Sequence, residues 1–93
     1  MSEASLFLLQ SRFADTPLML DRVRQIYGPG DQILLMGEAV LFVEDTRLHD
    51  LPVSILATDA EILVKNLPEH IQVLDQNQFA ALVLQFTRCI TLK

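Results

Sequence analysis

Short apolar runs separated by amphipathic segments organise the chain. The runs have strand length and cover residues 5–10, 32–36, 53–57, 71–74 and 89–92. The first two are continuous rather than alternating, which is typical of strands that are covered on both faces in a parallel sheet. The pattern therefore predicts five strands.

The segment after the first run has the spacing of a helix. Thr16 followed by Pro17 predicts the helix start, with Thr16 as N-cap. Five apolar residues then recur at helical spacing: Met19, Leu20, Val23, Ile26 and Tyr27. Gly28-Pro29-Gly30 ends this helix and precedes a strand, whereas a phosphate-binding loop follows a strand and opens a helix, so nucleotide binding is not indicated.

Two further helices are predicted in the second half of the chain. Thr58 is the expected N-cap of one, whose inner stripe consists of Ala60, Leu63, Val64 and Leu67. Asp75 or Asn77 is expected to cap the other, whose core face consists of Phe79, Leu82, Val83 and Phe86. Its opposite face, with Ala80, Ala81 and Leu84, is apolar too, and such an exposed patch usually marks an interface.

The order of these elements predicts the fold class. Residues 38–43 are expected to form a short helix, although the β-branched Val40 and Val43 also permit a strand, and residues 44–51 read as a polar loop. Strands and helices alternate throughout. We therefore expect one α/β domain over residues 1–93, with a mostly parallel sheet of about five strands and helices on both faces.

Composition and charge narrow the function classes. Of the 93 residues, 51% are hydrophobic and 20% are charged. This composition excludes a disordered chain, and its hydrophobic fraction is high for a small monomer. The net charge of −5 has the wrong sign for a surface that binds nucleic-acid phosphates, so direct nucleic-acid binding is not expected. No run reaches the roughly 18 residues of a membrane span and the start lacks a basic signal region, so we expect a cytoplasmic protein that does not bind membranes.

Few residues are candidates for a catalytic or metal-binding role. Cys89 is the one soft nucleophile, but its place in an apolar strand favours a buried structural role over a catalytic one. His49 and His70 lack metal-ligand spacing, so neither a metal nor a cofactor is expected. Ser11 follows the first strand without an evident general base, which makes a catalytic serine improbable.

Charged residues cluster in the loop of residues 44–51. Glu44, Asp45 and Asp50 surround Arg47. The simplest interpretation is a solvated loop, and the alternative is a docking surface for a basic partner.

Three stretches together resemble the TusB/DsrH family of small α/β subunits of bacterial sulfur-relay complexes. Residues 30–40 (GDQILLMGEAV) are similar to the family's glycine-acidic entry, apolar strand and short helix. Residues 53–63 (VSILATDAEIL) are similar to its third strand and capped helix, and residues 73–82 (VLDQNQFAAL) to its last strand-to-helix junction. The resemblance covers nearly the full length of the chain and implies a DsrEFH-like fold.

The chain also departs from the family pattern. Phe7 and Arg12-Phe13 stand where the family has a histidine and a Ser-Pro pair, and Leu92 lies near the place of its terminal tryptophan. Some members carry a cysteine on the first helix, implicated in sulfur transfer, and Val23 aligns with that cysteine. Valine cannot hold a persulfide.

The resemblance therefore implies a non-catalytic structural and docking subunit, an accessory of a sulfurtransferase complex. The implied partners are two related subunits, DsrE/DsrF-like or TusD/TusC-like, and the implied pathway is transfer of sulfur toward thiouridine at the tRNA wobble position or, in the Dsr branch, oxidative sulfur metabolism. The expected contact residues lie after the second strand and toward the C-terminus: Gly37, Glu38, Val40, Leu41, Leu84 and Leu92.

Two alternatives stay open. Cys89 could itself carry the persulfide, aided by the neighbouring Arg88. Otherwise the chain could be a homo-oligomeric binder of a small molecule at the carboxyl ends of the strands near Ser11 and Gly37.

Overall fold

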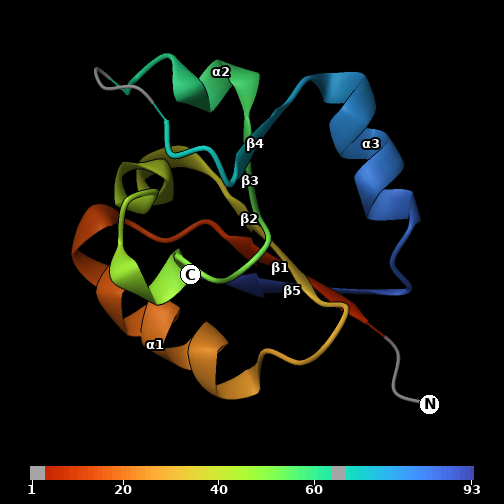
Figure 1. Cartoon of the computed structure of the whole chain (residues 1–93), viewed down its shortest axis with the longest axis horizontal. Helices are drawn as coiled ribbons and strands as arrows, with labels where there is room; N and C mark the ends of the chain where they lie inside the picture. The colour runs from red at the N-terminus through yellow and green to blue at the C-terminus, as the bar shows by residue number, and fades with distance from the viewer. Residues whose placement is uncertain (1–3, 64–66) are drawn as a thin grey trace.

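A single five-stranded sheet forms the centre of the molecule. The structure is a computed structural model, and it describes residues 4–63 and 67–93. The strands run parallel in the spatial order β4-β3-β2-β1-β5 (Figure 1). Their bounds are β1 Ser5–Leu9, β2 Gln32–Leu35, β3 Val53–Leu56, β4 Ile71–Leu74 and β5 Arg88–Leu92. All five predicted strands are thus confirmed, and β4 and β5 form the two edges.

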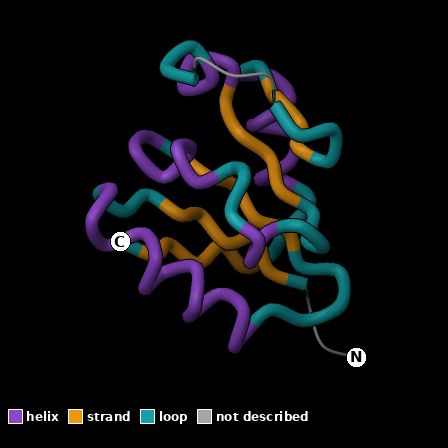
Figure 2. The backbone as a smooth tube through the Cα atoms, turned by 60° about the vertical axis from the view of Figure 1, so that its left-hand side comes forward, coloured by secondary structure: helices purple, strands orange, loops and turns teal. Residues whose placement is uncertain are grey.

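Helical segments connect the strands and lie on both sides of the sheet (Figures 1 and 2). The α-helices are α1 Thr16–Ile26, the single turn α2 Ala57–Ala60, and α3 Gln76–Leu84. Three 3-10 helices complete the connections: η1 Phe13–Asp15, η2 Gly37–Phe42 and η3 Thr46–Leu48. The predicted fold class, α/β with a parallel sheet and helices on both faces, is confirmed.

One face of the sheet, called here the closed face, carries the main core. Cross-strand register aligns Phe7 with Ile33, Ile33 with Val53 and Val53 with Ile71. These four side chains are buried, and they cluster with residues of α1 and of the 3-10 helices: Met19, Leu20, Val23, Ala39, Val40 and Leu48. Alternation of side chains along each strand places this whole row on one face.

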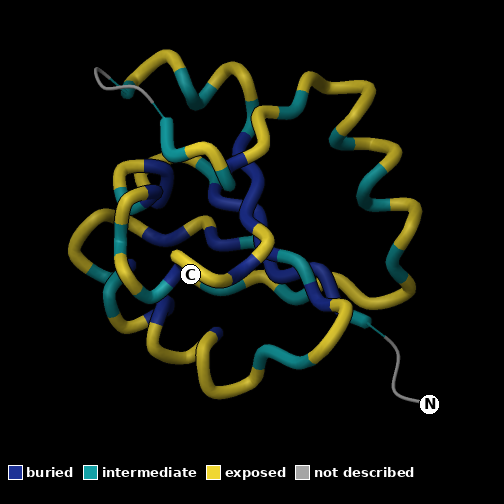
Figure 3. The backbone as a smooth tube through the Cα atoms, in the orientation of Figure 1, coloured by how far each residue is buried: buried dark blue, intermediate teal, exposed yellow. Residues whose placement is uncertain are grey.

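The other face, called here the open face, is covered less completely. Leu6 and Leu34 are fully buried on it, but α3, the helix on this side, has no buried residue. Figure 3 shows the difference, with dark blue along the strands and yellow along much of α3. Phe79, Leu82, Val83 and Phe86 are half-buried while Ala80, Ala81 and Leu84 are exposed. The predicted inner face of α3 is therefore oriented correctly, but its assignment to the core is wrong for the isolated chain.

A buried carboxylate fixes the start of β1 and the turn before β2. The Asp31 Oδ1 atom accepts a hydrogen bond from the Ser5 backbone N–H at 2.7 Å, and Oδ2 accepts one from the Gly28 N–H at 2.9 Å. Gly30, with φ of +86°, supplies the left-handed residue that this turn requires. The Gly28-Pro29-Gly30 segment is thus a structural turn.

Two local predictions need correction. Thr58 is not an N-cap, because α2 already begins at Ala57 with Leu56 as its N-cap residue. The loop of residues 44–51 is not simply polar and solvated, because it contains η3 and buries Leu48 in the core. Val64 of the predicted second helix lies outside the described residues.

Other local predictions hold wholly or in part. The segment after β2 is a short 3-10 helix rather than a strand. The predicted helix start is confirmed, because α1 begins at Thr16, but the prediction of Thr16 as N-cap is wrong: Asp15 is the N-cap residue and Thr16 is the first, buried residue of the helix. Asp75 caps α3 in a capping box with Gln78.

Within the described residues, no helix has the length and apolar character needed to cross a membrane.

Candidate functional site

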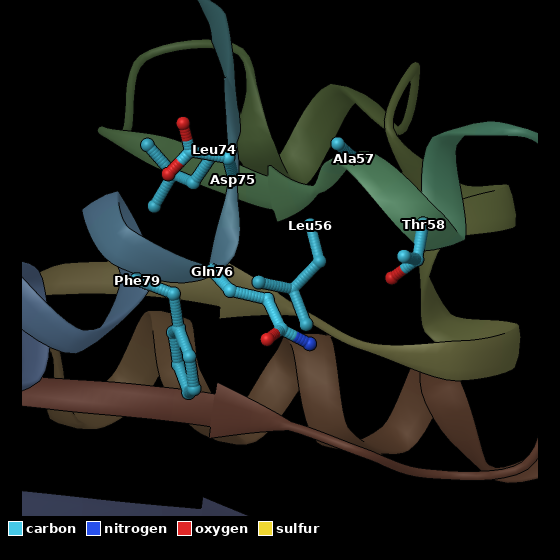
Figure 4. Close-up of a pocket in the computed structure, with 7 residues that line it drawn as sticks. All are labelled: Leu56, Ala57, Thr58, Leu74, Asp75, Gln76 and Phe79. Carbon is cyan, nitrogen blue, oxygen red and sulfur yellow. The ribbon is translucent and has the colours of Figure 1, made fainter.

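A hollow in the described part of the chain lies at the carboxyl ends of β3 and β4, beside α3. Its volume is about 560 Å³. Seven residues line it (Figure 4): Leu56, Ala57, Thr58, Leu74, Asp75, Gln76 and Phe79. Parallel α/β sheets commonly bind ligands at this edge, where the connections to the following helices diverge.

The chain direction explains the shape of this hollow. β3 continues directly into α2 and β4 continues through Asp75 into α3, so the two helices leave the sheet from adjacent strand ends. Phe79 points from α3 toward the sheet in Figure 4 and forms one wall. The lining is mostly apolar, so the hollow is suited to apolar groups of a ligand or partner.

The one carboxylate in this hollow is already engaged. Asp75 Oδ1 accepts a hydrogen bond from the Gln78 N–H at 2.7 Å, and Gln78 Oε1 accepts one from the Asp75 N–H at 2.9 Å. The lining contains no thiol, histidine or basic side chain. The arrangement can bind, but it offers no group for nucleophilic or acid-base catalysis.

The carboxyl end of β1 is closed instead. Ser11 is buried, and its Oγ lies 2.8 Å from Thr16 Oγ1, which also bonds the Arg12 carbonyl oxygen at 2.8 Å. Gly37 donates its backbone N–H to Asp59 Oδ2 at 3.2 Å. The alternative of a small-molecule site was placed near Ser11 and Gly37, whereas the apolar hollow lies farther along the same edge, at β3 and β4.

Cys89 lies in the edge strand β5 and is exposed. Its predicted burial is wrong, because α3 does not extend over this part of the sheet edge. The side chain of the neighbouring Arg88 donates a hydrogen bond through Nε to Ser5 Oγ at 2.7 Å. Successive residues of a strand point to opposite faces, so Arg88 and Cys89 are directed apart.

The six predicted contact residues differ in their surroundings. Gly37, Glu38, Leu41 and Leu84 are exposed and Leu92 is half-buried, with Leu84 reaching 85% exposure. Glu38 Oε1 accepts a hydrogen bond from the Phe13 N–H at 3.1 Å. Val40 must be corrected, because it is fully buried in the core and offers no surface to a partner. Contact between the other five and a partner stays a prediction.

The charged loop is internally paired. Arg47 contacts Asp45 Oδ1 and Asp21 Oδ1 at 2.9 Å each and donates to the Pro17 carbonyl oxygen, which joins the loop to α1. Arg24 pairs with Asp50 at 2.8 Å. Hydrogen bonds from Arg47 hold the pKa of Asp45 below its ordinary value. These pairs neutralise much of the charge on which docking of a basic partner would depend.

The two histidines come together although they are 21 residues apart in the sequence. The His49 and His70 rings meet edge to face, with centroids 5.9 Å apart. Among the described residues, no group of three or more metal-binding side chains could hold an ion.

Comparison with known proteins identifies the fold. No model of a known protein family and no curated protein sequence matches the chain. A solved structure, that of the ychN protein from E. coli, is similar over 99% of this chain and 100% of that chain, with a TM-score of 0.63 and 14% sequence identity. At this identity the likeness establishes the fold, which is the DsrEFH-like α/β fold that the resemblance implied.

Proposed function

We propose that this chain is a non-catalytic structural and docking subunit of a heteromeric sulfur-relay complex. Its TusB/DsrH-like role is to support persulfide transfer toward thiouridine at the tRNA wobble position. The observation that carries the proposal is Val23, which aligns with the sulfur-transfer cysteine of some family members and is fully buried on α1. A chain with a DsrEFH-like fold but no thiol at that position is suited to assembly rather than chemistry.

The open face supplies the surface for assembly. Along the outer face of α3, Ala80, Ala81 and Leu84 are exposed, and the apolar hollow lies on the sheet-facing side of the same helix, beside Phe79. Exposed apolar surface of this kind is typical of protein interfaces. The proposed partners are the two related DsrE/DsrF-like subunits, and the net charge of −5 favours tRNA contact through those partners.

Co-expression with the two related subunits, followed by size-exclusion chromatography, tests the proposal. The wild-type chain is expected to elute with both partners. Leu84→Asp is expected to abolish co-elution, because it places a charge in the proposed interface. Leu18→Asp is the matched control, since Leu18 is 56% exposed on α1 at the closed side. Absence of a complex, or equal behaviour of the two variants, contradicts the proposal.

The exposure of Cys89 favours a second candidate, a persulfide carrier. In that reaction the Cys89 thiolate attacks the outer sulfur of a partner's persulfide, an S–S bond forms at Cys89, and the partner's cysteine leaves as a thiolate. Cys89→Ser would then abolish sulfur transfer by the assembled complex without affecting assembly. Unchanged transfer in Cys89→Ser excludes this candidate and agrees with the docking role.

A further inference from the structure

A second, polar hollow lies at the opposite end of the sheet from the apolar one. Its volume is about 190 Å³, and it lies at the amino ends of β2, β3 and β4. Six residues line it: Gln32, Pro52, Val53, Ser54, His70 and Gln72. Cross-strand register places Ser54 beside Gln72 on the open face.

The polar side chains of this hollow have unused hydrogen-bonding capacity. Ser54 is only 4% exposed, yet its hydroxyl has no hydrogen-bond partner among the described residues. The His70 Nε2 atom is buried and likewise has no partner within that part of the chain. Of these two atoms only His70 Nε2 is itself fully buried, whereas Ser54 Oγ keeps some accessible surface. Buried polar groups are paired in the great majority of native structures, so an unpaired nitrogen next to an accessible hydroxyl favours an external partner.

We propose that this polar hollow binds a small, uncharged molecule that carries a carboxamide. The side chains of Gln32 and Gln72 each present a donor and an acceptor, which match the acceptor and donor of another amide. No Asp, Glu, Lys or Arg lines the hollow, so a bound ion would lack a countercharge. Pro52 and Val53 provide an apolar wall for the remainder of the molecule.

The size of the hollow agrees with this class. About 190 Å³ corresponds to roughly six waters at about 30 Å³ each, which is enough for a ring with one amide. The site uses none of the residues on which the docking role depends. It can therefore be present or absent whether or not the chain joins a sulfur-relay complex.

Titration of the ¹⁵N-labelled full chain with three matched probes tests the proposal. Benzamide is expected to shift the amide resonances of Ser54, His70 and Gln72 saturably, with a Kd of about 1 mM. N,N-dimethylbenzamide lacks the N–H donors and benzoate carries a charge, so each is expected to bind at least about tenfold more weakly.

Variants localise the binding. Ser54→Ala is expected to weaken benzamide binding about fivefold. Gln72→Leu, at an exposed position, is expected to have the same effect. Thr58→Ala, in the apolar hollow, is the control and should leave the affinity unchanged. The proposal is overturned if benzamide causes no saturable shift, if benzoate binds equally well, or if the shifts occur around Leu56 and Leu74 instead. Water would then be the sole occupant of the polar hollow.

Discussion

The closed and open faces of the sheet are built from the same strands, yet helices bury them to very different extents. On the closed face, α1 contributes four buried residues and packs with two 3-10 helices. On the open face, α3 contributes none, although its mean hydropathy is higher than that of α1. An apolar helix is therefore not by itself a core helix. The difference depends on what ties each helix to the rest of the chain.

The two helices also differ in their polar contacts. α1 is joined to the loop of residues 44–51 by the pairs of Arg47 with Asp21 and of Arg24 with Asp50, and Thr16 anchors its first turn. α3 has a capping box at its own N-terminus, which orders the helix but connects it to no other element. Exposed large apolar side chains nevertheless occur on both helices, at Leu18 and Ile26 of α1 and at Leu84 of α3. Four predictions, from the largest expected effect to the smallest, test this contrast.

Leu20→Ala on α1 is expected to lower the free energy of unfolding by about 3 kcal/mol, because it leaves a cavity in the closed core. Leu20 is fully buried there. Urea unfolding monitored by circular dichroism measures the loss. A loss below about 1 kcal/mol would show that the closed face is packed as loosely as the open one.

Phe79→Ala on α3 is expected to cost about 1–2 kcal/mol, less than the smaller Leu20 truncation, because Phe79 is only half-buried. The same urea titration measures this value. Leu84→Ala, at an 85% exposed position on the same helix, is the control and should change the stability negligibly. If Phe79→Ala cost more than Leu20→Ala, α3 would be a core helix in solution.

Asp75→Ala removes the capping box and is expected to cost about 1 kcal/mol. Because α3 is tied to little else, hydrogen exchange should accelerate in α3 and remain unchanged in α1. Mass spectrometry of exchanging peptides distinguishes the two helices. Equal acceleration in both would mean that the two faces unfold as one unit.

Asp45→Asn is expected to reduce stability by about 1 kcal/mol or less at pH 7, because it removes the charge that pairs with Arg47. The folded pKa of Asp45 is lowered, so the wild type has this contribution above the ordinary value near 4 and loses it as the pH falls through the folded pKa. The two proteins should therefore converge in acid. Asp50→Asn, in a more exposed pair, is the control and should reduce stability less at pH 7.

Much of the fold could be predicted because periodicity encodes strands and helices locally. The strand ranges and the Asp75 cap depend on near neighbours in the sequence, and both predictions are confirmed. The exposure of Cys89 and the half-burial of α3 could not be predicted in the same way. Both depend on where α3 lies relative to the edge strand, which no short-range pattern specifies.

The candidate sites were predictable to a lesser degree. A small-molecule site at the carboxyl edge of the sheet was one open alternative, placed near Ser11 and Gly37. The position of the apolar hollow at β3 and β4 follows from the strand order, which the sequence does not reveal. The polar hollow was missed because Gln32 comes from β2, Ser54 from β3 and His70 from the turn before β4, which are far apart in the sequence. The signal that could have indicated this hollow is a polar residue within an apolar strand run, such as Ser54.

The strand order also has a consequence for synthesis on the ribosome. β1 lies between β2 and β5, and the Arg88 side chain that bonds Ser5 is 83 residues away along the chain. At about 5–20 residues per second, β1 waits roughly 4–17 s after emerging before its β5 neighbour has been made. Throughout that interval one edge of a strand that is apolar after Ser5 is available to wrong partners, which makes the nascent chain a natural client for a chaperone.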